Sequence, residues 1–294
     1  MGPINIFRTI WQLRRHLAGH PLTKHNVTRS LLRFGRYQIA WRAARAPTIV
    51  NWVGGTRLII GAGMRGVTGE AYLGVNEFSD VLFVGHLLRR GDLLLDVGAN
   101  VGSYSILAAK VAGAHAIAVE PIPETVQQLE DHIRLNRVEN LVEVAALGVS
   151  DRPGELWFTG AEDALNHVTE EPGPDAQRVT VTTIDALLGE RKPTCIKIDV
   201  EQHELAVIEG AKRTLSEPSL HAVLLETGPK LRTESLRDTF SAHGLHPHRY
   251  DPFTRQLTKT AELGYHNTLF VRDTDFASAR VRAAPPIHVG SRAI

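Results

Sequence analysis

A single stretch in the first half of this 294-residue chain constrains the fold more than any other. Residues 93–97 form an apolar run that predicts a buried parallel strand. The turn Gly98–Gly102 leads directly into a helix expected over residues 103–111, and a second apolar run, residues 116–119, ends in Glu120. Strand, glycine turn, helix, strand and acid in this order form the first half of a nucleotide-binding βαβ unit.

The residue types in the turn bear on which nucleotide such a unit would bind. A dinucleotide fingerprint needs a third glycine so that the backbone can approach a pyrophosphate, but Asn100 carries a side chain there. S-adenosylmethionine has a ribose and an adenine but no phosphate. Glu120 could accept from both ribose hydroxyls, and Asp96 and Asn100 could meet the amino and carboxylate ends. An ordinary strand-to-helix turn remains the alternative.

Several motifs together resemble the FkbM family of S-adenosylmethionine-dependent methyltransferases, over roughly residues 70–272. They are Asp96-Val-Gly-Ala-Asn-Val-Gly102, Glu120-Pro-Ile-Pro123, Ile196-Lys-Ile-Asp-Val-Glu201 with Glu204 and Gly210-Ala211, and Glu226 at the end of an apolar run. The resemblance implies O-methylation, often of sugar hydroxyls in natural products and glycans. One position departs from it, because Gln202 stands where the family usually carries glycine.

The resemblance also implies a fold: an α/β, class I Rossmann-like sheet of seven strands, mostly parallel with the last strand antiparallel, flanked by helices. It places Leu147 and Gly148 at the adenine. The expected cofactor-binding residues are therefore Asp96, Gly98, Ala99, Asn100, Gly102, Glu120, Pro121, Leu147, Gly148 and Asp199.

Three parts of the chain are expected. Residues 1–69 would form a basic extension with helices over 4–17 and 28–44 and a β-hairpin over 48–60. Residues 70–273 would form the methyltransferase domain, and residues 274–294 would be a loosely ordered tail.

Within the domain, strands are expected over 141–147, 194–199, 221–226 and 267–271 and from Arg249, and helices over 77–89, 123–135, 204–215 and 230–243. Two extra strands, 154–160 and 178–183, would flank an acidic loop, either a solvated tip or a lid.

Charge is distributed unevenly along the chain. Residues 1–69 hold eleven of the 33 Lys and Arg residues and no Asp or Glu, which leaves 22 basic against 32 acidic residues in the remainder. A basic arm of this kind can contact nucleic acid, an anionic membrane, its own acidic body or a second subunit in a homodimer. An Arg-rich, acid-free N-terminus also resembles a mitochondrial presequence, although this one includes a predicted hairpin.

Composition adds two further expectations. No apolar run approaches the roughly 20 residues needed to span a bilayer. The one cysteine, Cys195, lies in a predicted buried strand and cannot form an internal disulfide, so a structural thiol in a reducing interior is expected. The sequence therefore favours a cytoplasmic protein, with peripheral membrane contact through the basic arm left open.

Candidate catalytic residues gather where strands end, because open α/β sheets bind ligands at the carboxyl ends of their strands. Asp199, Glu201, His203 and Glu226 could take a proton from a hydroxyl acceptor, with His167 on the acidic loop as an outsider. If the helix after the fourth strand starts early, Glu201 and Glu204 would merely complement its positive end.

The segment after the fourth strand also bears on the reaction class. Nucleobase amine methyltransferases usually carry an Asn/Asp-Pro-Pro-aromatic segment there, and this chain reads Asp199-Val-Glu-Gln. Asp199, Glu201 and His203 are suitable metal ligands, but no specific Cys/His spacing is present, so no metal is expected.

Three hypotheses for the function remain. The first is an O-methyltransferase acting on a sugar, glycan or secondary-metabolite hydroxyl, the second is an RNA methyltransferase holding phosphate with the basic arm, and the third is a non-catalytic S-adenosylmethionine-binding protein. No specific nucleic-acid partner is expected.

Overall fold

The computed structural model describes residues 14–15, 17–24, 26–44, 47–61, 70, 73–159, 167–169, 173, 176–228 and 231–294. The helix predicted over residues 4–17 therefore lies mostly outside the described residues, as does most of the acidic loop 161–177. None of the helices in the described part of the chain combines the length and the apolar character needed to cross a membrane.

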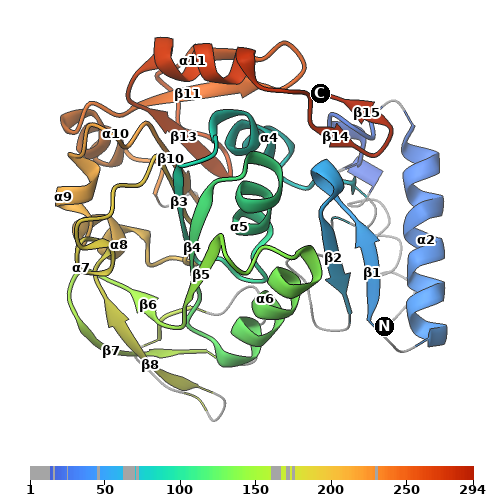
Figure 1. The fold of residues 1–294 in the computed structure, drawn as a ribbon, viewed down its shortest axis with the longest axis horizontal. Coiled ribbons are helices and arrows are strands. Elements are labelled where there is room, and N and C mark those ends of the chain that lie inside the picture. The colour runs from blue at the N-terminus through green and yellow to red at the C-terminus, as the bar shows by residue number, and fades with distance from the viewer. Residues whose placement is uncertain are drawn as a thin grey trace.

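An eight-stranded sheet forms the centre of the molecule (Figure 1). Its strands run in the order β12 (Gln256–Lys259), β11 (His246–Asp251), β13 (Asn267–Val271), β10 (Ala222–Glu226), β9 (Cys195–Ile198), β3 (Leu93–Val97), β4 (His115–Val119) and β5 (Val142–Ala145). The five strands from β10 to β5 are parallel, and β13 lies antiparallel between β10 and β11. The mostly parallel class I sheet with an antiparallel strand near its edge is thereby confirmed.

The eighth strand, β12, was not predicted. Asp251 accepts a hydrogen bond from the backbone N–H of Phe253, and Arg255 adopts a left-handed backbone conformation at φ 54°. This tight turn sends the chain back antiparallel along β11, so a hairpin adds one strand to the expected seven.

Helices cover both faces of the sheet, as Figure 1 shows. One face carries α4 (Phe78–Leu87), α5 (Ser103–Leu107) with the π-type turn η2 (Ala108–Ala112), α6 (Pro123–Asn136) and α11 (Thr274–Ala283). The other carries α7 (Ile184–Leu188), α8 (Glu204–Glu209), α9 (Lys212–Leu215) and α10 (Glu234–Ala242). Alternate residues of each strand serve the two layers: Leu94 packs with the first group of helices and Leu95 with the second.

The helix expected over residues 204–215 is broken into α8 and α9 at Gly210. A Cβ atom at Gly210 would lie 2.2 Å from the backbone carbonyl oxygen of Ser150. The glycine therefore allows this broken helix to approach Ser150, which directly follows β6 (Gly148–Val149). Strand β6 belongs to a small second sheet, in which the order is β6, β8 (Gln177–Thr182) and β7 (Gly154–Phe158). The two extra strands predicted around the acidic loop are β7 and β8.

The basic extension contains helix α2 (Val27–Ala44) and a hairpin of β1 (Thr48–Asn51) and β2 (Arg57–Ile60), joined by the 3₁₀ turn η1 (Val53–Gly55). The hairpin is not a separate body, because Leu58 and Ile60 are buried in the same core as α4 and α5. The amide of Asn136, at the end of α6, also accepts from the N–H of Arg57 and donates to its carbonyl. The hairpin therefore shares one core with the α/β domain that follows it.

The C-terminal segment is ordered, contrary to the expectation of a loose tail. It forms α11 and a short hairpin of β14 (His288–Val289) and β15 (Arg292–Ala293). Ala277 and Val281, four residues apart on α11, are buried, and Ile287 packs so closely on α4 that a Cβ atom at Gly85 would lie 2.7 Å from it. The Ala- and Arg-rich composition concealed this narrow apolar stripe, because packing rather than propensity orders such a short helix.

Replacing Ile287 with Ala tests this ordering. Ile287 is only 3% exposed, so the substitution should lower the free energy of unfolding by about 2–5 kcal/mol, the usual cost of such a core truncation. Chemical denaturation is the measurement. Leu205→Ala, at a side chain that is 60% exposed, should change stability by no more than about 0.5 kcal/mol. Equal effects of the two substitutions would mean that the tail does not pack on the domain.

Candidate active site

A cavity of about 290 Å³ lies at the carboxyl ends of the central parallel strands. Most of the predicted cofactor residues line it together: Gly98, Ala99, Asn100, Glu120, Pro121, Leu147, Gly148 and Asp199. Three of the four predicted catalytic residues line it, since Glu201 and His203 do so together with Asp199. The fold therefore gathers the ends of β3, β4, β5 and β9 around one space, as the topology of an open parallel sheet requires.

Two predicted cofactor residues, Asp96 and Gly102, lie off the cavity. Asp96 is 1% exposed, and its Oδ2 accepts hydrogen bonds from the backbone N–H of Ser105 at 3.1 Å and from its hydroxyl at 2.7 Å. At Gly102, a Cβ atom would lie 2.2 Å from the Leu129 side chain of α6. Asp96 thus fastens α5 to β3 and Gly102 lets two helices meet, so both are structural parts of the turn.

Glu120 closes the turn from the next strand. Its Oε2 accepts from the backbone N–H of Asn100 and its Oε1 from that of Ile122, both at 3.0 Å. The side chain is 7% exposed, and burial raises the pKa of its carboxyl group to about 7. Each carboxylate oxygen can still accept a second hydrogen bond, so Glu120 can receive hydroxyl groups of a ligand in the cavity.

Gly98 is required for a reason other than approach to a ligand. Its φ is 76°, and a Cβ atom there would lie 1.8 Å from the backbone carbonyl oxygen of Asp199. The turn after β3 therefore touches the end of β9 directly. From the sequence we expected Gly98 to make room for a ligand. In the structure, the missing side chain makes room for the carbonyl group of Asp199, so that the ends of β3 and β9 are in contact.

Lys197, in the middle of β9, is a site residue that the sequence analysis missed. Its side chain is 6% exposed, its Nζ lies 2.8 Å from Asp199 Oδ2, and it sits 5.1 Å from the centre of the Tyr104 ring. Burial alone would lower the pKa of Lys197, but the charges of Asp199, Asp96 and Glu77 outweigh it and raise that pKa. A lysine within an otherwise apolar strand motif was the available signal.

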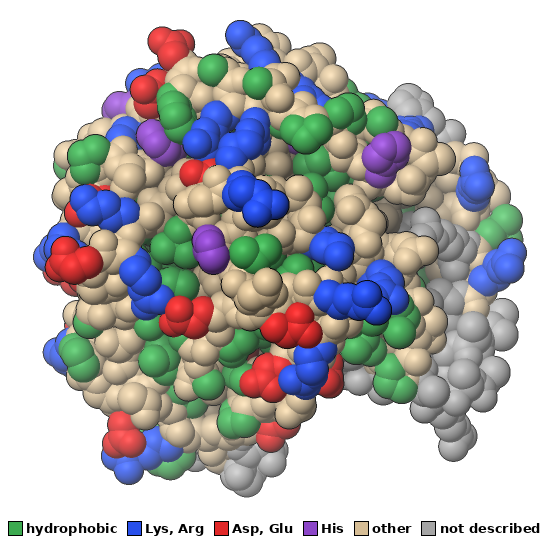
Figure 2. All heavy atoms as spheres, in the orientation of Figure 1, with side chains coloured by type: hydrophobic (Ala, Val, Ile, Leu, Met, Phe, Trp, Pro, Cys, Tyr) green, Lys and Arg blue, Asp and Glu red, His purple; other side chains and the backbone are tan. Residues whose placement is uncertain are grey.

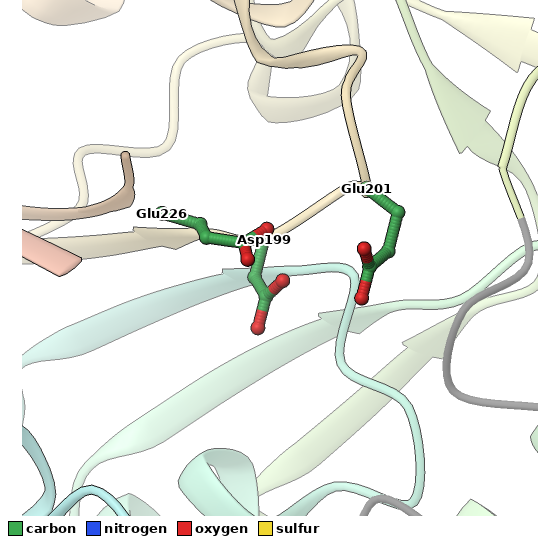
Figure 3. Close-up of side chains that lie close together, drawn as sticks. All are labelled: Asp199, Glu201 and Glu226. Atoms are coloured by element: carbon green, nitrogen blue, oxygen red, sulfur yellow. The ribbon is translucent and has the colours of Figure 1, made fainter. Parts of the chain in front are cut away.

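Three carboxylates, one of them the ion-pair partner of Lys197, lie close together, as Figure 3 shows. Ligand atoms of Asp199, Glu201 and Glu226 all lie within 4.8 Å of one another, close enough to share a metal ion. Glu226 is absent from the cavity lining, and it meets the cavity through a hydrogen bond with Asp199. His203, considered from the sequence as a metal ligand, instead holds Ser150 Oγ at 2.9 Å from its Nε2.

The three carboxyl groups have different proton affinities. Burial works to raise the pKa of Asp199, but the Lys197 charge and hydrogen bond hold it below its ordinary value. Burial and the Asp199 charge raise the pKa of Glu226 to about 9, and burial and Asp199 raise that of Glu201 to about 7. Near neutral pH, Asp199 is therefore ionised, Glu226 holds a proton, and Glu201 can exchange one.

The turn after β9 explains the glycine usual at position 202. Glu201 and Gln202 adopt left-handed backbone conformations, at φ 50° and 75°. Glu204 holds this turn, because its Oε1 accepts from the backbone N–H groups of Val200 at 3.3 Å and Gln202 at 3.2 Å. The structural interpretation of Glu204 is thereby supported, whereas Glu201 faces the cavity. Gln202 occupies the turn without abolishing it.

The opposite wall of the cavity comes from residues that the sequence analysis did not single out. Trp52, at the end of β1, donates from Nε1 to Glu70 Oε2 at 2.7 Å. The Tyr104 hydroxyl donates to Glu77 Oε2 at 2.8 Å, and Asn267 Nδ2 donates to Glu77 Oε1 at 2.6 Å. The basic extension thus contributes a wall of the site through Trp52.

A groove of about 790 Å³ adjoins the cavity and shares Glu201 and His203 with it. It lies between the small sheet and the start of α8. Hydroxyl, imidazole, carboxylate and guanidinium side chains line it beside apolar ones; among them are Ser150, Arg152, Leu156, His167, Val168 and Thr169. His167, the outsider among the proton acceptors, therefore lies on the groove and acts electrostatically on Glu201.

Comparison with known proteins identifies a matching family. The model of the methyltransferase FkbM domain matches residues 96–248, more than half of the chain. The chain is 29% identical over 152 residues to the hexuronic acid methyltransferase AglP of Haloferax volcanii, covering 50% of this chain and 62% of that protein. It is 27% identical over 132 residues to the ribosomal protein L11 methyltransferase of Thermotoga maritima, covering 44% and 49%. The matches thus span about half to three fifths of these relatives.

Solved structures resemble the chain more distantly. The C-terminal domain of precorrin-6Y C5,15-methyltransferase from Rhodobacter capsulatus matches with a TM-score of 0.38 at 17% identity, covering 67% of this chain and 87% of that one. TrmK of M. capricolum in complex with S-adenosyl-homocysteine matches with a TM-score of 0.38 at 9% identity, covering 66% and 68%.

Restoring glycine at position 202 tests the account of the turn. Gln202→Gly removes the strain of a side chain in the left-handed region but increases the freedom of the unfolded chain, so stability should stay equal or rise by up to about 1 kcal/mol. Gln202→Val, with a β-branched side chain, should lower it by about 1–3 kcal/mol. Chemical denaturation compares the two. A stabilising Val or a strongly destabilising Gly would contradict the left-handed conformation.

Proposed function

This chain belongs to the FkbM methyltransferase family, and we propose that it transfers a methyl group from S-adenosylmethionine to a hydroxyl of a sugar, glycan or related secondary metabolite. One observation carries the proposal. A single cavity has the Glu120 carboxylate on one strand end and the Lys197–Asp199 ion pair, with Glu201 beside it, on another. Such a cavity can hold a nucleoside at one end and present a proton acceptor at the other.

The residues of the cavity fit the proposed cofactor. Glu120 suits the ribose hydroxyls, and the apolar side chains of Ile122, Leu147 and Phe158 suit an adenine. Glu77 and Asp199 both act electrostatically on Lys197. The acidic region that these two carboxylates form suits the positively charged methionyl group of the cofactor. When bound, S-adenosylmethionine supplies a methyl group on a sulfonium, an already activated electrophile, so that positioning accounts for most of the protein's contribution.

Glu201 is the best-matched group to take the proton of the acceptor hydroxyl. A general base works best with a pKa near the working pH, and burial brings the pKa of Glu201 to about 7. Asp199, another of the candidates from the sequence, is a weaker base because Lys197 holds its pKa low. We therefore propose that Asp199 orients the acceptor hydroxyl. Glu226, in its protonated form, donates a hydrogen bond to Asp199.

The groove supports a sugar as the acceptor class. It opens onto Glu201 and His203, so an acceptor lying in it would present a hydroxyl to the proposed base. Its mixture of polar side chains with Leu156 and Trp157 offers both hydrogen bonds and apolar contact, which a sugar ring can use. The relative named as a hexuronic acid methyltransferase supports the same class.

Replacing Glu120 with Ala tests the cofactor assignment. Loss of the carboxylate should weaken S-adenosylmethionine binding by about 1.5–3 kcal/mol, or roughly 10- to 150-fold in Kd, the usual range for a hydrogen bond to a charged group. Titration calorimetry measures this. Glu124→Ala, at an exposed carboxylate one turn further on, is the matched control and should bind normally. A folded Glu120→Ala protein with unchanged affinity would refute the ribose assignment.

The pH profile tests the base. Glu201 must be ionised to accept a proton, so kcat/KM, which reports the free protein, should fall as the pH drops through about 7 and level off above that value. Glu201→Gln should lower kcat by about 10²–10⁴-fold while S-adenosylmethionine still binds. Transfer of a labelled methyl group to a panel of hexose and hexuronic acid glycosides is the assay.

Glu209→Gln, an exposed carboxylate on α8, should keep both the rate and the profile and serves as the control. A Glu201→Gln protein of normal rate would move the base to His203 or Asp199. Asp199→Asn is a less direct test, because it leaves the buried Lys197 ammonium without its nearest counter-charge and should also destabilise the fold.

A further inference from the structure

Helix α2 presents a basic face to solvent. Arg29, Leu32 and Arg36 follow one another at intervals of three and four residues, which places them on one side of a helix. All three are exposed, and Leu32 is 65% exposed, whereas Ser30 on the inner side is only 9% exposed. In Figure 2, over the outer side of α2, a hydrophobic side chain lies between Lys or Arg side chains.

A second exposed apolar side chain lies on the neighbouring hairpin. Ile49 of β1 is 55% exposed, next to the exposed Thr48. Strand β1 and α2 lie side by side in Figure 1, and Asn51 and Arg29 line one common hollow. We call Arg29, Leu32, Arg36 and Ile49 the α2–β1 surface.

The segment that carries this surface has charged side chains of one sign. No Asp or Glu occurs in residues 1–69, which hold eleven Lys and Arg residues, while the remaining chain carries ten more acidic than basic residues. An anionic surface would therefore attract the basic segment and repel the acidic remainder of the chain. An attraction of this kind orients the protein as well as holding it.

We propose that the α2–β1 surface docks on an anionic lipid bilayer. Basic side chains near such a bilayer are attracted by its negative surface potential, and exposed Leu and Ile side chains can enter the boundary between headgroups and acyl chains. Leu32 and Ile49 favour lipid over nucleic acid, because aliphatic side chains neither stack well on bases nor bond to phosphate. The hairpin that docks also carries Trp52 to the wall of the cavity.

Co-sedimentation of the full chain with vesicles tests the proposal. The protein should bind vesicles in which phosphatidylglycerol replaces part of the phosphatidylcholine, should leave phosphatidylcholine vesicles unbound, and should be released by salt. Arg29→Glu combined with Arg36→Glu should weaken binding by about tenfold or more, and Leu32→Asp should weaken it as well.

Matched controls lie elsewhere on the surface. Arg90→Glu combined with Arg137→Glu changes net charge equally at exposed positions outside the α2–β1 surface, and Leu205→Asp introduces the same charge at another exposed leucine. Both controls should bind vesicles as the unaltered chain does. Equal loss in the controls, retained binding in the α2 variants, or tight binding of RNA without binding of vesicles would each overturn the proposal.

Discussion

The rest of the site depends on the electrostatic interaction of the buried Lys197 ammonium group with the carboxylates around it. Strand β9 pairs with β3 so that Lys197 lies opposite Asp96, and the same ammonium reaches Asp199 two residues further on. Asp96 is 1% exposed and would otherwise be an ionised group in a poorly hydrated interior, which costs several kcal/mol. One buried cation thus allows the sheet to carry carboxylates at its centre, and removing it would leave several of them uncompensated.

The two halves of the site are mechanically one unit. The turn after β3 touches the carbonyl of Asp199 at Gly98, and Glu204 holds the turn after β9 by two backbone hydrogen bonds. Glu120 fixes the first turn in the same way, through the N–H of Asn100. A shift of either turn therefore moves the other, so the proposed nucleoside end and the proposed proton acceptor keep their relative positions without a dedicated linking element.

The sequence predicted the strands and their carboxyl ends well, because apolar runs and their terminal acids are local features. It did not predict which side of β3 Asp96 would face, so that residue was assigned to a ligand although it holds α5. Lys197 was missed because a lysine in a strand usually faces solvent, and its burial is made tolerable by the charges of Asp199, Asp96 and Glu77. Trp52 and Glu77 come from outside the nucleotide motif, and no local pattern connects them to it.

Proton affinities around the cavity follow from the same shortage of cations. Burial raises the pKa values of Glu70, Asp80 and Glu120 to about 7, since Lys197 alone cannot neutralise every carboxylate nearby. Any positively charged ligand entering the cavity favours the ionised form of these groups and is held by them in return. On the proposed function, methyl transfer turns a sulfonium into a neutral thioether. The cavity then loses attraction for the product, so the acidity that recruits the donor also favours its release.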